Sequence, residues 1–271
     1  MSTTISASLV KELRDLTGAG MMDCKRALEE TDGDLDAART LLRERGLASA
    51  GKKSGRTTSD GLVGYIVAPD GRTGSILGIG SETDFVAKND EFRAFAMKVL
   101  RAVHAEGEPA VESFEAERLE LIGRLGENIV FLGAAHFEVP DAHVVAAYTH
   151  PPANKIGVLV ELSGRTPELA RQVAMHISFA APEWRTKEEV PEAVVDAERQ
   201  IFLRSDEVGS KPEAAREKIV DGMLAKRFFA ATPGGVLVEQ AWIHEPAKTV
   251  GQALAEAGAA VERFTRISVA G

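Results

Sequence analysis

Few residues in this chain have the types and spacing that covalent or metal-assisted chemistry requires. The six histidines stand at positions 104, 136, 143, 150, 176 and 244, and no two of them are four residues apart, as a helical zinc site would need. Cys24 is the only cysteine, which rules out an internal disulfide and a cluster of thiolate ligands within one chain. A Gly-x-Ser-x-Gly elbow for a nucleophilic serine is also missing. The sequence therefore predicts no catalytic residue, no metal site and no cofactor, and we expect a protein that is not an enzyme.

Two glycine-containing stretches imitate nucleotide-binding loops without meeting their requirements. Residues 46–53 nearly fit a P-loop, but Lys53 stands where a hydroxyl must hold magnesium, and the stretch leaves a predicted helix rather than a strand. Residues 78–83 begin like a dinucleotide-binding fingerprint, but Thr83 stands in place of the third glycine. In the true fingerprint that glycine lets helix and strand approach closely. These stretches alone would favour a small α+β enzyme, and tight binding of a small molecule by the isolated chain would be its signature.

Residues 79–90 are the most informative stretch, because they place an acidic residue beside a large aromatic one where a strand should end. Asn89 is suited to cap the next helix, which has its own apolar stripe at three- and four-residue spacing. That stripe consists of Phe92, Phe95, Ala96, Val99, Leu100 and Val103. Phe85 lies outside it, and an aromatic on a connecting loop can bury about 150–250 Å² in a partner, which contributes about 1.5–3 kcal/mol. We interpret Phe85 as an anchor for a partner, with a place in the chain's own core as the competing interpretation.

The length and composition are those of an ordinary globular protein with an acidic charge balance. A chain of 271 residues is long enough for about two domains, and 44% hydrophobic residues can fill a sizeable core. The formal net charge of -9 argues against binding along a phosphate backbone, so nucleic acid is not an expected ligand. No apolar run approaches the roughly 18 residues of a membrane span, and the N-terminus lacks a leader-like pattern. These features predict a cytoplasmic protein that does not bind a membrane.

The first 47 residues are predicted to form three short helices. Apolar residues recur there with helical spacing, and glycines interrupt the pattern between the helices. Asp34 can cap the third helix, and Gly46 is typical of a helix end. Residues 48–60 are rich in Gly, Ser, Thr, Lys and Arg, as a solvated linker is. We therefore predict a three-helix domain over residues 1–47, similar to the ubiquitin-associated (UBA) type, and a linker over 48–60.

The rest of the chain is predicted to form two related subdomains, over residues 61–140 and 141–271. Each begins with two strands around a proline-containing turn and continues into a helix, which gives helices packed on antiparallel sheets. The strands are predicted over 62–68, 74–80, 144–149, 156–162 and 261–269. The predicted fold class is therefore α+β.

A helical hairpin is predicted within residues 188–230 of the second subdomain. Two helical patterns are joined there by Val-Gly-Ser-Lys at 208–211. Apolar residues of the first helix are expected to face those of the second. These residues are Val194, Ala197 and Ile201 on one side and Ile219 and Met223 on the other.

Several motifs of the chain resemble those of one family. The run Thr83-Asp84-Phe85-Val86-Ala87-Lys88 resembles the signature of the elongation factor Ts family, the nucleotide exchange factors of bacterial and organellar translation. Residues 13–25, 173–176 and 245–251 are similar to further segments of this family, in the same order and along nearly the whole chain.

The resemblance implies a partner and a mechanism. Members bind elongation factor Tu in its GDP-bound form, in a 1:1 or 2:2 complex, promote GDP release and let GTP enter. Phe85 would enter between helices of the GTPase domain while Asp84 makes a neighbouring polar contact, which displaces the elements that hold magnesium and phosphate. The hairpin within 188–230 would project from the core as an antiparallel coiled coil. The residues expected to contact the partner are Thr83, Asp84, Phe85, Val86, His176, Arg14, Met21 and Met22.

The residue types alone leave other interpretations open. Met21 and Met22 could fill gaps in the helical domain, Arg14 could simply be solvated, and His176 could be a satisfied residue of a helix over about 166–181. If the helical domain alone mattered, the chain would be a ubiquitin-like or other protein-binding adaptor without exchange activity, and its first 50 residues would suffice for binding.

Overall fold

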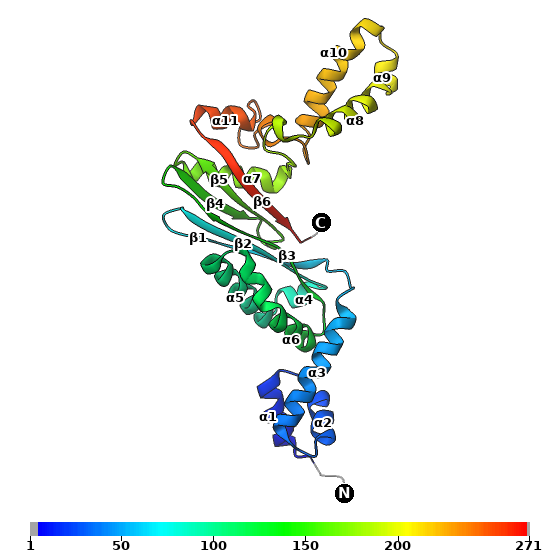
Figure 1. Cartoon of the computed structure of the whole chain (residues 1–271), viewed down its shortest axis with the longest axis vertical. Helices are drawn as coiled ribbons and strands as arrows, with labels where there is room; N and C mark the ends of the chain where they lie inside the picture. The colour runs from blue at the N-terminus through cyan, green and yellow to red at the C-terminus, as the bar shows by residue number, and fades with distance from the viewer. Residues whose placement is uncertain (1–4, 270–271) are drawn as a thin grey trace.

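Two three-stranded antiparallel sheets, stacked face to face, form the centre of the structure. This computed structural model describes residues 5–269, apart from the side chains of residues 47, 49 and 50. Helices cover the outer face of each sheet, the N-terminal helices extend from one end of this core, and a helical hairpin extends from the other (Figure 1). The α+β fold class with antiparallel sheets, predicted from the sequence, is confirmed.

Helices α1 (Ala7–Thr17), α2 (Met21–Glu30) and α3 (Leu35–Lys53) form the N-terminal bundle. The Ser6 hydroxyl caps α1 by accepting from the backbone N–H of Leu9, and Gly18 ends this helix at a φ of +66°, which glycine adopts without strain. The three helices bury a shared apolar core of Val10, Leu13, Cys24, Ala27, Leu28 and Ala38. This packing stabilises helices that would be marginal in isolation.

Helix α3 is longer than the sequence indicated. The prediction ended the helical domain at residue 47 and placed a linker over 48–60, whereas α3 continues through Gly46 to Lys53. Gly46 lies within the helix, where α3 crosses α6 (Glu115–Leu125), and a glycine there lets the two backbones approach. Only residues 54–59 lie outside helix and strand between the bundle and the first sheet.

The first sheet has the strand order β1-β2-β3 and is covered by α5 and α6. Its elements are β1 (Asp60–Val67), β2 (Thr73–Ser81), α4 (Asp84–Ala87), α5 (Asp90–Glu106), the 3-10 helix η1 (Glu108–Phe114), α6 and β3 (Ile129–Glu138). Neither α6 nor β3 was among the predicted elements. The sequence of β3 is almost entirely apolar or small, so it lacks the alternation by which a half-exposed strand is recognised.

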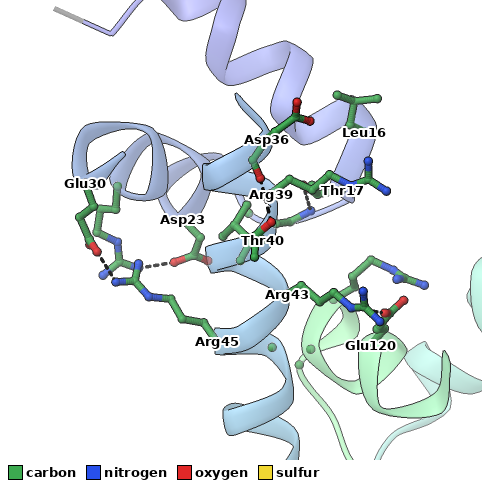
Figure 2. A pocket seen from close by; sticks show the side chains of 18 of the residues that line it. Leu16, Thr17, Asp23, Glu30, Asp36, Arg39, Thr40, Arg43, Arg45 and Glu120 are labelled. Atoms are coloured by element: carbon green, nitrogen blue, oxygen red, sulfur yellow. Dashed lines mark hydrogen bonds and ion pairs between the residues drawn. The ribbon is translucent and has the colours of Figure 1, made fainter. Parts of the chain in front are cut away.

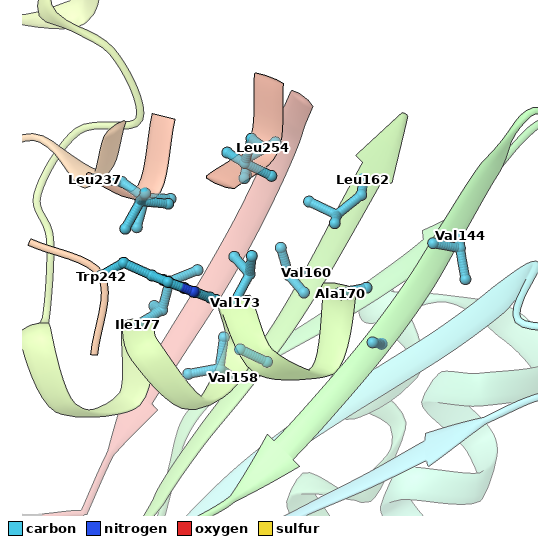
Figure 3. Packing of buried hydrophobic residues seen from close by; sticks show 14 residues of the cluster. Val144, Val158, Val160, Leu162, Ala170, Val173, Ile177, Leu237, Trp242 and Leu254 are labelled. Atoms are coloured by element: carbon cyan, nitrogen blue, oxygen red, sulfur yellow. The ribbon is translucent and has the colours of Figure 1, made fainter. Parts of the chain in front are cut away.

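The second sheet repeats this arrangement with the strand order β4-β5-β6. Its elements are β4 (His143–Thr149), β5 (Ile156–Ser163), α7 (Pro167–Ala180), the 3-10 helices η2 (Lys187–Glu189) and η4 (Leu237–Glu239), α11 (Val250–Glu256) and β6 (Ala260–Ser268). Val173 and Ile177 of α7 pack on Val158 and Val160 of β5, and Trp242 adjoins this cluster (Figure 3). Two strands, a helix and a third strand therefore recur in each half of the core.

Glycines allow the two sheets to approach closely. A Cβ on Gly157 of β5 would lie 2.4 Å from Cγ1 of Val63 in β1, and a Cβ on Gly78 of β2 would lie 2.4 Å from Cγ2 of Ile267 in β6. The apolar side chains that fill the rest of this interface are Val63, Ile76, Ala135, Phe137, Val139, Val145, Ala147, Leu159, Ile267 and Val269. Any larger residue at either glycine would push the sheets apart, which is why their spacing depends on these positions.

The helical hairpin consists of α8 (Glu192–Leu203), α9 (Asp206–Gly209), α10 (Glu213–Met223) and the π-helical turn η3 (Leu224–Phe229). The predicted hairpin is present, but the predicted face of its first helix is wrong. Val194 and Ile201 are exposed, and the neighbouring Val195 and Phe202 pack instead against Val220 and the other buried residues of α10 and η3. The extra turn α9 ends α8 earlier than expected and changes how the two helices meet.

We expect Gly157→Ala to destabilise the protein by about 1–3 kcal/mol, because the added methyl group overlaps Val63 of the facing sheet. The matched control is Gly222→Ala in α10. Within residues 5–269, nothing beyond its own helix backbone and chain neighbours lies within 4 Å of the added Cβ, and the change should stabilise by up to about 1 kcal/mol. Urea unfolding of both variants measures this difference. Equal shifts in the two variants would contradict the role of Gly157 in sheet spacing.

Candidate partner-binding site

Phe85 lies in a short helical turn that directly follows strand β2. Helix α4 covers only Asp84–Ala87, so the aromatic stands on a helical turn rather than on the irregular loop that the sequence suggested. Its side chain is 82% exposed, whereas the next two residues, Val86 and Ala87, are buried in the core cluster of the first sheet. The exposure excludes the competing interpretation of Phe85 as a core residue. Burial of the two residues after it fixes the turn and leaves the ring outside.

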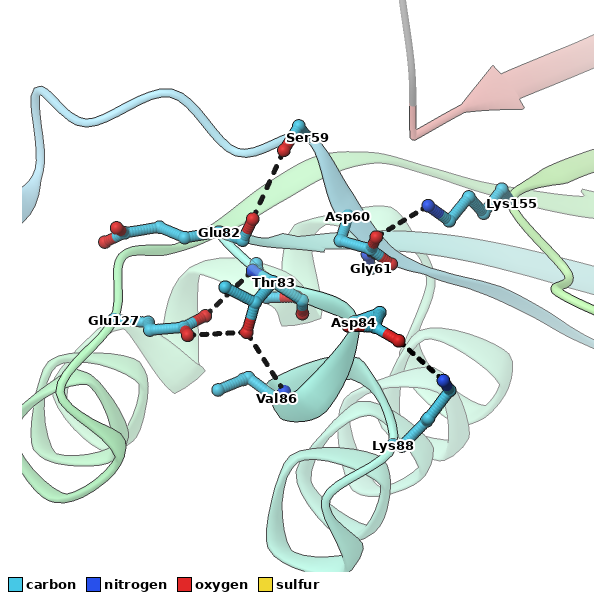
Figure 4. A network of polar contacts seen from close by, with 11 residues as sticks. Ser59, Asp60, Gly61, Glu82, Thr83, Asp84, Val86, Lys88, Glu127 and Lys155 are labelled. Carbon is cyan, nitrogen blue, oxygen red and sulfur yellow. Dashed lines mark hydrogen bonds and ion pairs between the residues drawn. The ribbon is translucent and has the colours of Figure 1, made fainter.

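A carboxylate from another element holds the start of this turn. Thr83 is the N-cap of α4, and its hydroxyl and backbone N–H donate to Oε1 and Oε2 of Glu127 at 2.6 Å and 3.0 Å (Figure 4). Hydrogen bonds to an ionised acceptor are stronger than those between neutral groups. Ser81 of β2 donates to the Thr83 carbonyl at 3.0 Å. Thr83 therefore joins the strand end, the turn and Glu127.

Glu127 is a functional candidate that the sequence did not reveal. It follows Gly126, which ends α6 at a φ of +81°, and it stands 44 positions after Thr83. A glycine after an apolar helical pattern indicates a helix end. However, no local pattern indicates that the next carboxylate reaches back to a turn so distant in the chain.

Asp84 pairs within the turn rather than pointing freely outward. Lys88 Nζ donates to Asp84 Oδ2 at 2.6 Å, and this hydrogen bond lowers the pKa of the Asp84 carboxyl, which is therefore ionised at neutral pH. Both residues line a groove of about 720 Å³ beside the edge strand β1 and helix α5. At this groove Lys155, which directly precedes β5, pairs with Asp60 of β1 at 2.7 Å. The exposed ring thus stands next to a groove with paired charges along it.

The predicted residues of the bundle are exposed as well. Met21 and Met22 open α2 and are 50% and 64% exposed, and Leu16 near the end of α1 is exposed as well. Arg14, two residues earlier in α1, is also exposed. We call these four residues the bundle surface. Methionines that filled gaps in the bundle would be buried, so that alternative is excluded, and exposed thioethers adapt readily to a partner's shape.

His176 does not lie where a direct contact requires. It is on α7 as predicted, but it is fully buried, its Nε2–H donates to Gln240 Oε1 at 3.0 Å, and its Nδ1 accepts from the backbone N–H of Ile243 at 3.4 Å. Its ring also lies 5.3 Å from that of Trp242, centroid to centroid. The expected contact of His176 with a partner is therefore corrected: its imidazole positions residues 240–243, and the interior has no room for a second protein.

Burial also fixes the charge state of His176. Loss of solvent around the ring lowers the pKa of His176, and the two hydrogen bonds require the neutral tautomer with the proton on Nε2.

Of the predicted site residues, the structure brings Thr83, Asp84, Phe85 and Val86 together at one turn. The bundle surface is on α1 and α2 and His176 is on α7, and these helices lie apart from α4 (Figure 1).

Within residues 5–269 no three His, Cys, Asp or Glu side chains gather in a way that could hold a metal ion. Over the same part of the chain, no helix combines the length and apolar character needed to cross a bilayer.

The comparisons with known proteins agree with the motifs. Residues 82–271 match the family described as elongation factor TS. This chain belongs to the elongation factor Ts family. The elongation factor Ts of Alkalilimnicola ehrlichii is 43% identical over 98% of this chain and 92% of the relative, and those of Thioalkalivibrio sulfidiphilus and Ruegeria pomeroyi are 40% and 41% identical with the same coverage. Membership in the elongation factor Ts family implies a nucleotide exchange factor for elongation factor Tu in translation elongation.

We expect Glu127→Ala to loosen the turn that carries Phe85. Removing the acceptor leaves the Thr83 N–H and hydroxyl without their partner, which should cost about 1–3 kcal/mol of stability and speed hydrogen exchange over residues 82–88. Glu117→Ala is the matched control, because Glu117 of α6 makes only an exposed pair with Lys98. Exchange over 82–88 that is equally slow in both variants would show that Glu127 does not hold the turn.

We expect the buried imidazole to make stability depend on pH. Because the folded state lowers the pKa of His176, the unfolded chain binds more protons as the pH falls below about 6.5, and stability decreases by at most about 1.4 kcal/mol per pH unit. Urea unfolding of the native chain and His176→Gln at pH 7.5 and 5.5 measures the effect. The native chain should lose more stability than the variant, and His104, whose pKa burial also lowers, is common to both. Equal losses would contradict a neutral, buried His176.

Proposed function

We propose that this elongation factor Ts binds GDP-loaded elongation factor Tu and accelerates GDP release by inserting Phe85 next to the magnesium and phosphate site. The observation that carries this proposal is the 82% exposure of an aromatic ring on a turn fixed from two sides, by the buried Val86 and Ala87 and by Glu127. Exposing such a ring to water is unfavourable, and burying it in a partner contributes about 1.5–3 kcal/mol. Because the turn is already ordered, little conformational entropy opposes binding.

The mechanism needs no covalent step. A GTPase holds GDP through backbone amides around the phosphates and through magnesium in strict octahedral geometry, so small displacements of these groups are costly. A ring that enters between helices of the GTPase domain displaces them, and the ionised Asp84 supplies a polar contact beside it. Because Asp84 already accepts a hydrogen bond from Lys88, its carboxylate must contact Lys88 and the partner at the same time or exchange one for the other. Binding free energy is converted into weaker GDP binding.

Linkage makes this effect reciprocal. If the factor weakens GDP binding by some ratio, GDP weakens binding of the factor by the same ratio, so an incoming nucleotide expels the factor. Opposing a tightly held nucleotide requires more than one contact. We assign the second contact to the bundle surface of Arg14, Leu16, Met21 and Met22. Its three apolar side chains are exposed and lie outside the core cluster of the bundle. We also propose that the factor acts in the cytoplasm, as its family of translation factors suggests.

An adaptor without exchange activity is the alternative function. The exposed bundle surface would favour it if residues of the bundle bound alone. However, an adaptor function does not explain why the core carries an exposed aromatic on a turn that Glu127 holds.

We expect Phe85→Ala to reduce the acceleration of GDP release about ten- to hundredfold, the equivalent of the burial free energy of the ring. Asp84→Ala should cause a smaller loss, because an exposed charge contributes less than a buried ring. Stopped-flow release of fluorescent GDP from elongation factor Tu measures both effects. Ile201→Ala, which shortens an exposed apolar side chain of the hairpin, is the control and should act as the native chain does. Native acceleration in both Phe85→Ala and Asp84→Ala would contradict the wedge.

A further inference from the structure

The last turns of α6 and the three residues after them contact both of the proposed binding areas. One side of this segment, residues 120–128, touches the bundle that carries Met21 and Met22. Its end touches the turn that carries Phe85. The end of α6 and the Phe85 turn share the core of the first sheet, whereas the bundle has its own separate core, so the contact with the bundle is an additional one.

The contact with the bundle is made by backbone. Helices α3 and α6 cross at Gly46 and Gly123, where a Cβ on Gly123 would lie 2.9 Å from Cα of Gly46 and 3.4 Å from its carbonyl carbon. A Cβ on Gly46 would meet Gly123 Cα at 3.7 Å, which is ordinary van der Waals contact. The crossing therefore depends on Gly123 more than on Gly46. A side chain at 123 would meet backbone, which cannot move aside as a flexible side chain can.

Charged side chains flank this crossing. Arg43 Nε of α3 pairs with Glu120 Oε1 of α6 at 2.8 Å, at the edge of a cleft of about 960 Å³ between bundle and core (Figure 2). Arg124 of α6 pairs with Glu91 of α5 at 2.5 Å, and its Cδ would lie 3.1 Å from a Cβ on Gly18 at the end of α1. The Arg124 stem thus packs on the bundle while its charged end is held by the core.

The other end of the segment reaches the Phe85 turn. Glu127 accepts both hydrogen bonds from Thr83, and the backbone N–H of Asn128 donates to Glu82 Oε1 at 2.6 Å. The buried Asn128 side chain also donates from Nδ2 to the Arg56 carbonyl at 2.8 Å, which ties down the chain between α3 and β1. The segment that receives the bundle is therefore the one that anchors the turn.

We propose that residues 120–128 form a bracket that fixes the bundle surface relative to Phe85, so that both can engage one molecule of the partner at once, with Gly123 as a positioning residue. This inference rests on the proposed function, because it assigns the two areas to the same partner. Two contacts held at a fixed separation act with a high effective concentration, and a loose connection loses this advantage without losing either contact. The bundle is thus a rigid extension of the core and not a module on a flexible linker.

The bracket is tested with three alanine variants that differ only in what the added methyl group meets. Gly123→Ala should shift the crossing, because its Cβ would lie 2.9 Å from the backbone of Gly46. Gly46→Ala should be tolerated at 3.7 Å. Gly51→Ala of α3 is the matched control, because nothing in the described part of the chain beyond its own helix backbone and chain neighbours lies within 4 Å of the added Cβ. Thermal unfolding of all three establishes that each variant is folded.

The first measurement needs no partner. Spin labels on cysteines introduced by Lys11→Cys in α1 and Arg101→Cys in α5, both exposed, report the distance between bundle and core by double electron–electron resonance. Burial raises the pKa of the Cys24 thiol, so this cysteine resists labelling. We expect one narrow distance distribution in the native chain, Gly46→Ala and Gly51→Ala. Gly123→Ala should give a shifted or broad one, and a broad distribution in the native chain would overturn the bracket.

The second measurement is GDP release from elongation factor Tu at increasing concentrations of the factor. Gly123→Ala should raise the half-saturating concentration at least about fivefold while the maximal rate stays within about twofold, because Phe85 and its turn are intact and only the effective concentration falls. A general structural defect would lower the maximal rate as well. Native half-saturation in Gly123→Ala with a shifted distance would overturn the proposal but leave the exchange function standing. If the native chain does not accelerate GDP release from elongation factor Tu, the proposed function fails, and so does the claim that both areas bind one partner. The measured distances still report whether the bundle is held rigidly on the core.

Discussion

The pair of hydrogen bonds from Thr83 to Glu127 is the interaction on which the position of the exposed Phe85 ring depends. Thr83 is at once the end of the segment that leaves β2 and the N-cap of α4, so its orientation sets the direction of the turn. An exposed aromatic on a mobile loop would fold back onto the nearest apolar surface. Held from Glu127 at its start and by two buried residues after it, this ring stays in solvent, where a partner can bury it.

A second constraint is the absence of side chains at a few contacts between layers. Gly78 and Gly157 let the two sheets meet, and Gly123 lets α6 meet α3. Each contact joins parts that are far apart in the sequence. Because no Cβ separates them, the two elements pack directly and the position of one fixes the position of the other. The bundle, the first sheet and the second sheet can therefore act as one body, which suits the proposed engagement of elongation factor Tu at more than one point.

The sequence predicted the parts that depend on local pattern. The three N-terminal helices, both hairpins of strands and the helical insertion follow from periodicity and turn residues, and the elongation factor Ts family follows from the run around Phe85. The exposure of Phe85 was predictable because it lies off the apolar stripe of the next helix. What the sequence missed depends on distant contacts: the continuation of α3 through Gly46, the strand β3, the burial of His176 against Gln240, and the anchoring by Glu127. The assignment of any residue to a partner contact stays a prediction.

The most direct test of the central claim replaces Phe85 with the photoreactive analogue benzoylphenylalanine and irradiates the complex with GDP-loaded elongation factor Tu. Cross-linked peptides, identified by mass spectrometry, show which part of the partner the ring touches. The wedge predicts cross-links to helices of the GTPase domain beside the magnesium and phosphate site. Efficient cross-links to another domain, or none while the complex forms normally, would contradict it.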